Sequence, residues 1–242
     1  MELARSCWSR ALAIDPLNAY VCHALCNLEC RLGNTKKAKE ILVEVVNQRP
    51  TSALCVALAE IERQTGAFNK ARETLLKGLK SCAEERSKLL LALAWLEEDA
   101  FNNVLEAESL LDESMRIDGN NVRVHIAKAS FELRLRRVDK AREILRNATS
   151  LKAEDGQHYT MWCTLELECG DVEKARSVIE EGYKKYPADH FLLQRWGTFE
   201  SRHGNQSKAR ELFEKSVLIQ PHAPTFVAWA IMEETEGSVV TF

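Results

Sequence analysis

An alanine recurs along this chain at an almost constant spacing, and that spacing is what most limits the folds open to it. The steps between successive alanines are 34, 33, 36, 34, 34 and 34 residues. A large apolar residue follows each alanine by four positions, and a small residue generally follows by seven. A period of this length, with two helices in each unit, is typical of a stacked helical solenoid. The alanines are Ala4, Ala38, Ala71, Ala107, Ala141, Ala175 and Ala209.

The stretch from Trp162 to Pro187 shows what one unit contains. Its first half places apolar residues at helical spacing, which predicts a helix with one buried face. Gly170 and Asp171 then indicate a helix end followed directly by the N-cap of the next helix. Pro187 favours the end of the second helix. Neither helix can bury its apolar face alone, so the unit requires neighbours on both sides.

The sequence therefore predicts an all-α fold, an α-α superhelix (solenoid) of six helix-turn-helix repeats forming a single domain over residues 1–242. The third repeat lacks a glycine at its turn and its alanine comes late, so we expect a longer loop there. The chain begins and ends in mid-unit, which predicts a segment of a longer protein or an incomplete gene product. The expected repeats span about 18–50, 51–82, 83–118, 119–152, 153–187 and 188–221, with half units at 1–17 and 222–242.

Composition and motifs argue against catalysis and against membrane insertion. No apolar run approaches the length of a membrane span. No P-loop, GxGxxG or HExxH pattern occurs, and the repeated glutamates are never paired with a second carboxylate, a histidine or a nucleophile. We therefore expect no enzyme activity, no cofactor and no small-molecule substrate.

The cysteines at 22, 26 and 30 are spaced as one helical face, which raises the question of a metal site. However, Cys26 and Cys163 stand in a repeat column that alanine or glycine fills elsewhere. That column requires a small side chain where helices approach closely, and a reduced cysteine satisfies it. No CxxC pair or HxxxH pattern is present, so packing is favoured over zinc and no metal site is predicted. The free thiols would suit a reducing compartment.

Glutamate stands nine residues before the alanine in six units, including Glu98 in the third, and a basic residue follows most of the alanines. One interpretation is that the basic side chains hold phosphates. The favoured one is a structural ion pair or hydrogen-bond clamp between the two helices of a unit, possibly extending to a neighbouring unit. The pairs expected are Glu29/Lys39, Glu62/Arg72, Glu132/Arg142, Glu166/Arg176 and Glu200/Arg210.

The alanine, large, small and proline columns resemble the tetratricopeptide repeat. Glutamate in the first helix, preceded by an aromatic residue such as Trp162, Trp196 or Trp229, resembles its half-a-TPR (HAT) variant. HAT repeats occur almost entirely in RNA-processing factors, which is what the resemblance implies about function. The regular step is most similar to the chloroplast psbB mRNA maturation factors of plants and algae, with nuclear HAT splicing factors second. The resemblance thus implies a chloroplast location, with the nucleus as the alternative.

In repeats of this type the first helices line a concave groove, into which two positions per helix, one turn apart, should point. In the third repeat these are Ala92 and Leu96. Neutral polar side chains with flanking arginines suit single-stranded RNA, because polar tips read base edges while arginine holds phosphate or stacks. The predicted RNA-binding residues are Arg123, Ser130, Arg134, Gln157, Thr160, Thr164, Gln194, Thr198 and Arg202.

Charge is uneven along the chain, with a net charge of +6 over residues 116–152 and −7 over residues 84–115. Two functions remain open from the sequence. In the first, the groove binds single-stranded RNA for mRNA maturation, stabilisation or translation. In the second, the chain is a protein-protein interaction scaffold in an RNA-processing complex and does not contact RNA. Partners of both kinds, RNA and protein, are therefore expected.

Overall fold

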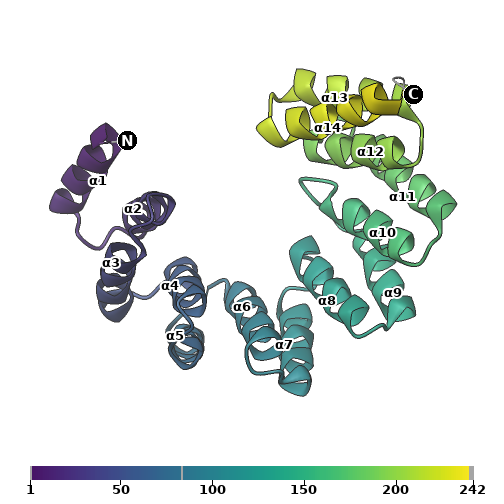
Figure 1. Ribbon diagram of the computed structural model, residues 1–242. Coiled ribbons are helices and arrows are strands. Elements are labelled where there is room, and N and C mark those ends of the chain that lie inside the picture. The colour runs from purple at the N-terminus through teal and green to yellow at the C-terminus, as the bar shows by residue number, and fades with distance from the viewer. Residues whose placement is uncertain (1, 83, 240–242) are drawn as a thin grey trace. The chain divides into compact units, whose positions relative to one another are not determined.

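The computed structural model describes residues 2–82 and 84–239, and every regular element in those ranges is an α-helix (Figure 1). The all-α prediction is confirmed. The helices are α1 (Glu2–Ile14), α2 (Ala19–Arg31), α3 (Thr35–Gln48), α4 (Ser52–Gln64), α5 (Phe68–Ser81), α6 (Arg86–Asp99), α7 (Val104–Ile117), α8 (Val122–Arg134), α9 (Val138–Ala148), α10 (Gln157–Glu168), α11 (Val172–Lys185), α12 (His190–Arg202), α13 (Gln206–Ile219) and α14 (Ala223–Val239).

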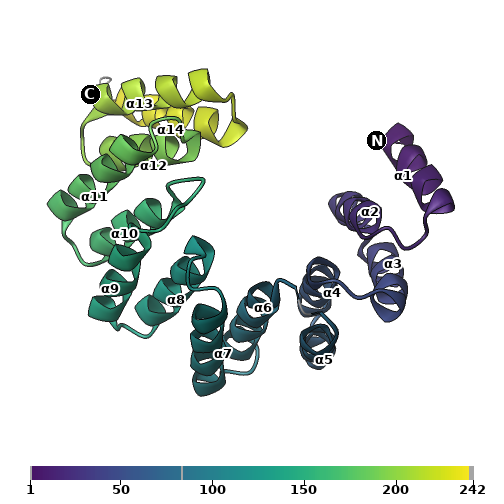
Figure 2. The same ribbon diagram turned by 180° about the vertical axis from the view of Figure 1, so that it is seen from behind.

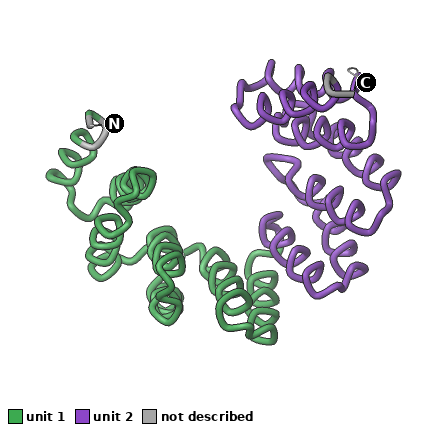
Figure 3. The backbone as a smooth tube through the Cα atoms, viewed as in Figure 1, with its two compact units in different colours: residues 1–119 green, residues 120–242 purple. Residues whose placement is uncertain are grey.

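The chain divides into two compact units, residues 1–119 and 120–242 (Figure 3). In each unit consecutive helices pair into hairpins, such as α4 with α5 and α10 with α11, and the view from behind shows the same pairing (Figure 2). The first helices of successive hairpins also contact one another: α2, α4 and α6 in the first unit, and α8, α10, α12 and α14 in the second. This is the stacking that a solenoid requires.

The alanine column marks where the two helices of each hairpin meet. Six alanines of the column, from Ala38 to Ala209, are completely buried. Gly182, seven residues after Ala175, packs closely on α10. A Cβ added to this glycine would lie 2.7 Å from Tyr159 Cβ. The repeated small residues therefore set the approach distance between helices, as the column predicts.

The turns inside the hairpins are short. The turn of the second repeat, residues 65–67, contains Gly66 with a φ of 74°, a left-handed conformation that glycine adopts without steric cost. The corresponding turn of the third repeat spans residues 100–103 and is one residue longer, so the expected longer loop is confirmed. There Asn102 takes the left-handed conformation, with a φ of 52°.

The cysteines are free thiols, and five of the eight are buried, while Cys7 and Cys169 are exposed. Cys26 and Cys163 are buried, and Cys26 Sγ donates to the carbonyl of Ala38 at 3.5 Å, at the helix contact that their column marks. Within the described ranges no three histidine, cysteine, aspartate or glutamate side chains gather as metal ligands would. None of the helices described there is both long and apolar enough to cross a membrane.

Candidate functional site

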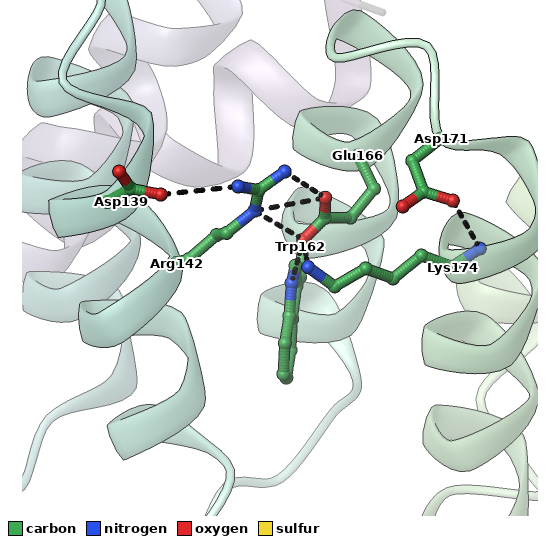
Figure 4. A network of polar contacts seen from close by, with 6 residues as sticks. All are labelled: Asp139, Arg142, Trp162, Glu166, Asp171 and Lys174. Atoms are coloured by element: carbon green, nitrogen blue, oxygen red, sulfur yellow. Dashed lines mark hydrogen bonds and ion pairs between the residues drawn. The ribbon is translucent and has the colours of Figure 1, made fainter.

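Glu166 of α10 lies at the centre of a polar network that joins three helices (Figure 4). Its carboxylate accepts hydrogen bonds from Arg142 of α9 at 2.7 to 3.1 Å, from the Trp162 indole at 2.8 Å and from Lys174 Nζ at 2.9 Å. The glutamate side chain is completely buried. Burial alone would raise the pKa of its carboxyl, but the donors from Arg142, Lys174 and Trp162 outweigh it and lower the pKa to about 2.

We call this arrangement the clamp: a tryptophan indole and an arginine from the preceding repeat, both donating to one glutamate. It recurs in the next repeats of the second unit, and its cation-glutamate part recurs in the first unit, with a lysine in one case and an arginine in the other. The further examples are Trp196 and Arg176 on Glu200, Trp229 and Arg210 on Glu233, Lys39 on Glu62, and Arg72 on Glu97.

The predicted pairing within one repeat is wrong in a specific way. Arg176 pairs with Glu200 of the following repeat at 3.1 Å, rather than with Glu166. The reason is the direction of the side chain, because the second helix of each repeat packs on the first helix of the next one as well as on its own partner. From their own repeat, Glu166 takes Lys174 and Glu29 takes Lys37. The clamp therefore fastens one repeat to the next.

In the third repeat, the position predicted for the buried glutamate is wrong by one residue. Its buried glutamate is Glu97, which pairs with Arg72 at 2.6 Å, and not Glu98. The extra turn residue moves Ala107 one position further from the glutamate, so counting back nine from the alanine gives the wrong residue. The same shift affects the expected groove positions, since Leu96 is buried while Trp95 is 42% exposed.

Two hollows lie on the first helices of the second unit. The apolar hollow, of about 480 Å³, has a floor of Ile126, Met161 and Leu192 with polar side chains around it. Four of the predicted RNA-binding residues line it, and its rim also holds Phe191, which is 46% exposed. The complete lining is Ile126, Gln157, Thr160, Met161, Thr164, Asp189, Phe191, Leu192, Gln194 and Arg195.

The second hollow, of about 490 Å³, is the arginine hollow, named for Arg134 and Arg136 in its wall. It shares Met161 and Thr164 with the apolar hollow, so the two adjoin. Glu168 is the one acidic residue in its lining. Its lining is Ser130, Leu133, Arg134, Arg136, Met161, Thr164 and Glu168.

Comparison with known proteins places the chain in a family. The family model described as "Suppressor of forked protein (Suf)" matches residues 17–239. The chain belongs to the Suf family. No curated protein matches this Suf chain significantly.

Solved structures similar to this Suf chain are repeat proteins. A tetratricopeptide repeat protein from Parabacteroides merdae is 16% identical, with a TM-score of 0.60, covering 95% of this chain and 91% of its own. Yeast Tom70 is 17% identical, with a TM-score of 0.61, over 83% of this chain and 44% of its own. A human IFIT1 dimer solved with PPP-AAAA is 13% identical, with a TM-score of 0.54, over 89% and 58%. At these identities the likeness shows the fold alone, a solenoid of tetratricopeptide type.

The threonines of the Suf chain's groove face have their hydroxyl protons committed to the backbone. Thr160 donates to the carbonyl of Gln157 at 2.7 Å, Thr164 to that of Thr160 at 2.9 Å, and Thr198 to that of Gln194 at 3.0 Å. A hydroxyl bonded in this way keeps only acceptor capacity. Thr160 and Thr164 therefore offer the apolar hollow acceptors and methyl groups, and no donors.

Three predicted residues line neither hollow. Arg123 is exposed in the first turn of α8, Thr198 is half-buried in α12, and Arg202 is exposed at the end of α12. Ser130 lies in the wall of the arginine hollow, where its hydroxyl contacts Met161 Sδ at 3.7 Å.

Sequence reasoning missed several side chains of this surface. Phe191 and Arg195 lie on either side of the predicted Gln194, one helical turn apart, so their place on the same face could have been found by extending the helical period. Arg136 could have been identified in another way, because it stands at the turn position where four other repeats have glycine. In the first unit, Trp95 carries the Arg63 guanidinium 4.1 Å from its ring centroid, with Glu60 bonded to the same arginine.

The arginines of the basic zone, residues 116–152, have two kinds of surroundings. Arg142 and Arg137 bond to the glutamates Glu166 and Glu132, at 2.7 and 3.3 Å. Arg134 and Arg136 line the arginine hollow. Arg142 of the repeated column thus serves the stacking of repeats, while Arg134 and Arg136 belong to the candidate binding surface.

Proposed function

We propose that this Suf chain is a non-catalytic RNA-processing factor that binds single-stranded RNA on the first helices of its second unit. The observation that carries the proposal is the adjacency of the two hollows through Met161 and Thr164. A single RNA strand alternates a charged phosphate with a flat base whose edges accept and donate hydrogen bonds. An arginine-lined hollow beside an apolar hollow matches that alternation.

The apolar hollow has the chemistry for a base. The exposed Phe191 ring offers a stacking surface, and Gln157 and Gln194 carry amides that can donate to and accept from a base edge. Thr160 and Thr164 add acceptors, which suit an exocyclic amino group. The human IFIT1 structure with PPP-AAAA supports the idea that a solenoid of this class can hold such a ligand.

The finer assignment rests on the resemblance to HAT-repeat factors. We propose a role in mRNA maturation, stabilisation or translation, as in the chloroplast factors, and a chloroplast location, with the nucleus as the alternative. Fluorescent tagging of the full-length protein in its native cells tests the location, and an exclusively cytosolic signal would contradict both.

A second candidate is a protein scaffold without RNA contact. The apolar floor of Ile126, Met161 and Leu192 favours it, because such a floor can also take an apolar side chain of a peptide. Under this alternative the arginines would affect partner binding only weakly, and the protein would show no affinity for RNA.

Fluorescence titration of the full-length protein with short single-stranded RNAs at two salt concentrations separates the candidates. We expect Arg123→Ala/Arg134→Ala to weaken binding to all sequences and to flatten its salt dependence. Thr160→Ala/Thr164→Ala should instead alter the preference among bases. Arg146→Ala, an exposed arginine on α9 that lines neither hollow, is the matched control. If the wild type binds no RNA, or if neither double variant differs from the control, the scaffold replaces the RNA site.

A further inference from the structure

Arg136, in the turn between α8 and α9, holds a backbone conformation that its side chain disfavours. Its φ is 60°, in the left-handed region, where a Cβ crowds the following carbonyl. The corresponding turns of four other repeats use glycine, with φ between 74° and 81°: Gly33, Gly66, Gly170 and Gly204. The remaining turn of this kind uses Asn102, and asparagine tolerates this region better than arginine does.

The backbone of the turn gives no reason for an arginine. The Arg136 amide donates to the carbonyl three residues earlier, Leu133, at 2.9 Å. Gly170 makes the equivalent bond to Leu167 at 3.0 Å, and Gly66 makes it to Arg63 at 2.9 Å. Glycine would therefore form the same turn with less strain.

The side chain of Arg136 is exposed and lines the arginine hollow together with Arg134. Its side chain thus forms part of the candidate binding surface, and Glu168 is the one acidic residue in the lining. A residue kept in a strained conformation, at a place where strain serves no purpose in the fold, indicates a role for its side chain.

We propose that Arg136 is a phosphate-binding residue, and that the arginine hollow takes a phosphodiester group of the single-stranded RNA. The inference rests on the proposed function and adds a residue that the helical period of the groove does not reach. A guanidinium presents its N–H donors in a planar fork that matches two phosphate oxygens, which glycine cannot replace and lysine replaces only as a point charge.

The test is Arg136→Gly, because strain and binding give it opposite expected effects. Removal of the Cβ should raise the urea midpoint of unfolding, while loss of the guanidinium should lower RNA affinity by about fivefold. The slope of log K against log salt should become shallower by about 0.7, the value for one phosphate contact on a single strand. Arg136→Lys should keep part of the affinity that Arg136→Gly loses, and should show none of its gain in stability.

Asn102→Gly is the matched control, since it relieves the same backbone conformation at a residue that lines neither hollow. It should leave RNA affinity and salt slope unchanged. Inorganic phosphate is the competitor that distinguishes a free phosphate site from an RNA site. If phosphate displaces RNA at concentrations at which another salt of the same ionic strength has little effect, the hollow would be assigned to the free anion.

The outcomes separate this inference from the proposed function. No RNA binding by the wild type overturns both. RNA binding that Arg136→Gly leaves unchanged overturns the phosphate role alone. A lower urea midpoint for Arg136→Gly would show that the arginine stabilises the turn, and would remove the reason for assigning it a ligand.

Discussion

Glu166→Gln tests the clamp most directly, because glutamine keeps the shape of the side chain and removes only its charge. The fall in the carboxyl pKa from 4.5 to about 2 corresponds to about 3 kcal/mol of stabilisation of the charged form by the fold. Arg142 and Lys174 are partly exposed and can recover water when the carboxylate is lost. We therefore expect Glu166→Gln to lower the free energy of unfolding by about 2 kcal/mol at pH 7.

The sign of the pH dependence follows from the lowered pKa. The stabilisation is complete above the pKa of the unfolded carboxyl, about 4.3, and is lost as the pH falls towards 2. The difference between wild type and Glu166→Gln at pH 3 should therefore be about half of its value at pH 7. Urea titrations followed by circular dichroism at the two pH values give both numbers.

Glu173→Gln is the matched control for this experiment. Glu173 also accepts from an arginine, Arg176 at 2.9 Å, but its side chain is 85% exposed. Such a surface pair contributes roughly 0.5 kcal/mol or less. Equal urea midpoints for Glu166→Gln and Glu173→Gln would refute the argument that burial gives the clamp its strength.

Three further predictions concern the core, the hollow and acid sensitivity. Ala175→Leu should lower the free energy of unfolding by about 1–3 kcal/mol through overpacking of the helix seam, while Ser177→Leu on the exposed face of the same helix should not; equal urea midpoints would contradict the assigned register. Glu168→Gln should raise RNA affinity about twofold at low salt, since it removes the carboxylate of the arginine hollow; unchanged titrations would mean that RNA does not pass there. Burial, together with Lys185, lowers the pKa of His158 to about 4, so acidification from pH 6.5 to 4 should destabilise the wild type more than His158→Gln in urea titrations; parallel losses would exclude that histidine.

The regular parts of the fold could be predicted because each repeat meets nearly the same surroundings. A fully buried position such as Ala175 tolerates little variation, so it appears in the sequence as a column with a fixed period. The glycine turn at Gly170 is visible for the same reason, since its φ of 81° restricts the choice of residue. Helices and their buried faces follow from these positions without knowledge of any particular contact.

The repeat period did not predict which glutamate each repeated arginine would pair with. Arg142 lies 10 residues after the glutamate of its own repeat and 24 residues before that of the next one, and both spacings recur along the chain, so the columns fit both pairings. Only the packing of α9 on α10 selects Glu166. The sequence also could not predict that the hydroxyls of Thr160 and Thr164 donate to backbone carbonyls. These hydrogen bonds depend on the side-chain rotamer and not on the helical face.

Departures from the repeat columns therefore carry the information about function, provided that packing does not account for them. Lys128 stands in the column of Trp162, yet it is buried and bonds to Glu132 at 3.3 Å, so the exchange of tryptophan for lysine is compensated within the fold. Arg136 stands in the column of Gly170, in a conformation that disfavours it, with its side chain directed to solvent at the arginine hollow. Glycine would satisfy the fold there, so the presence of arginine points to a ligand, and a phosphate is the group that its guanidinium fits best.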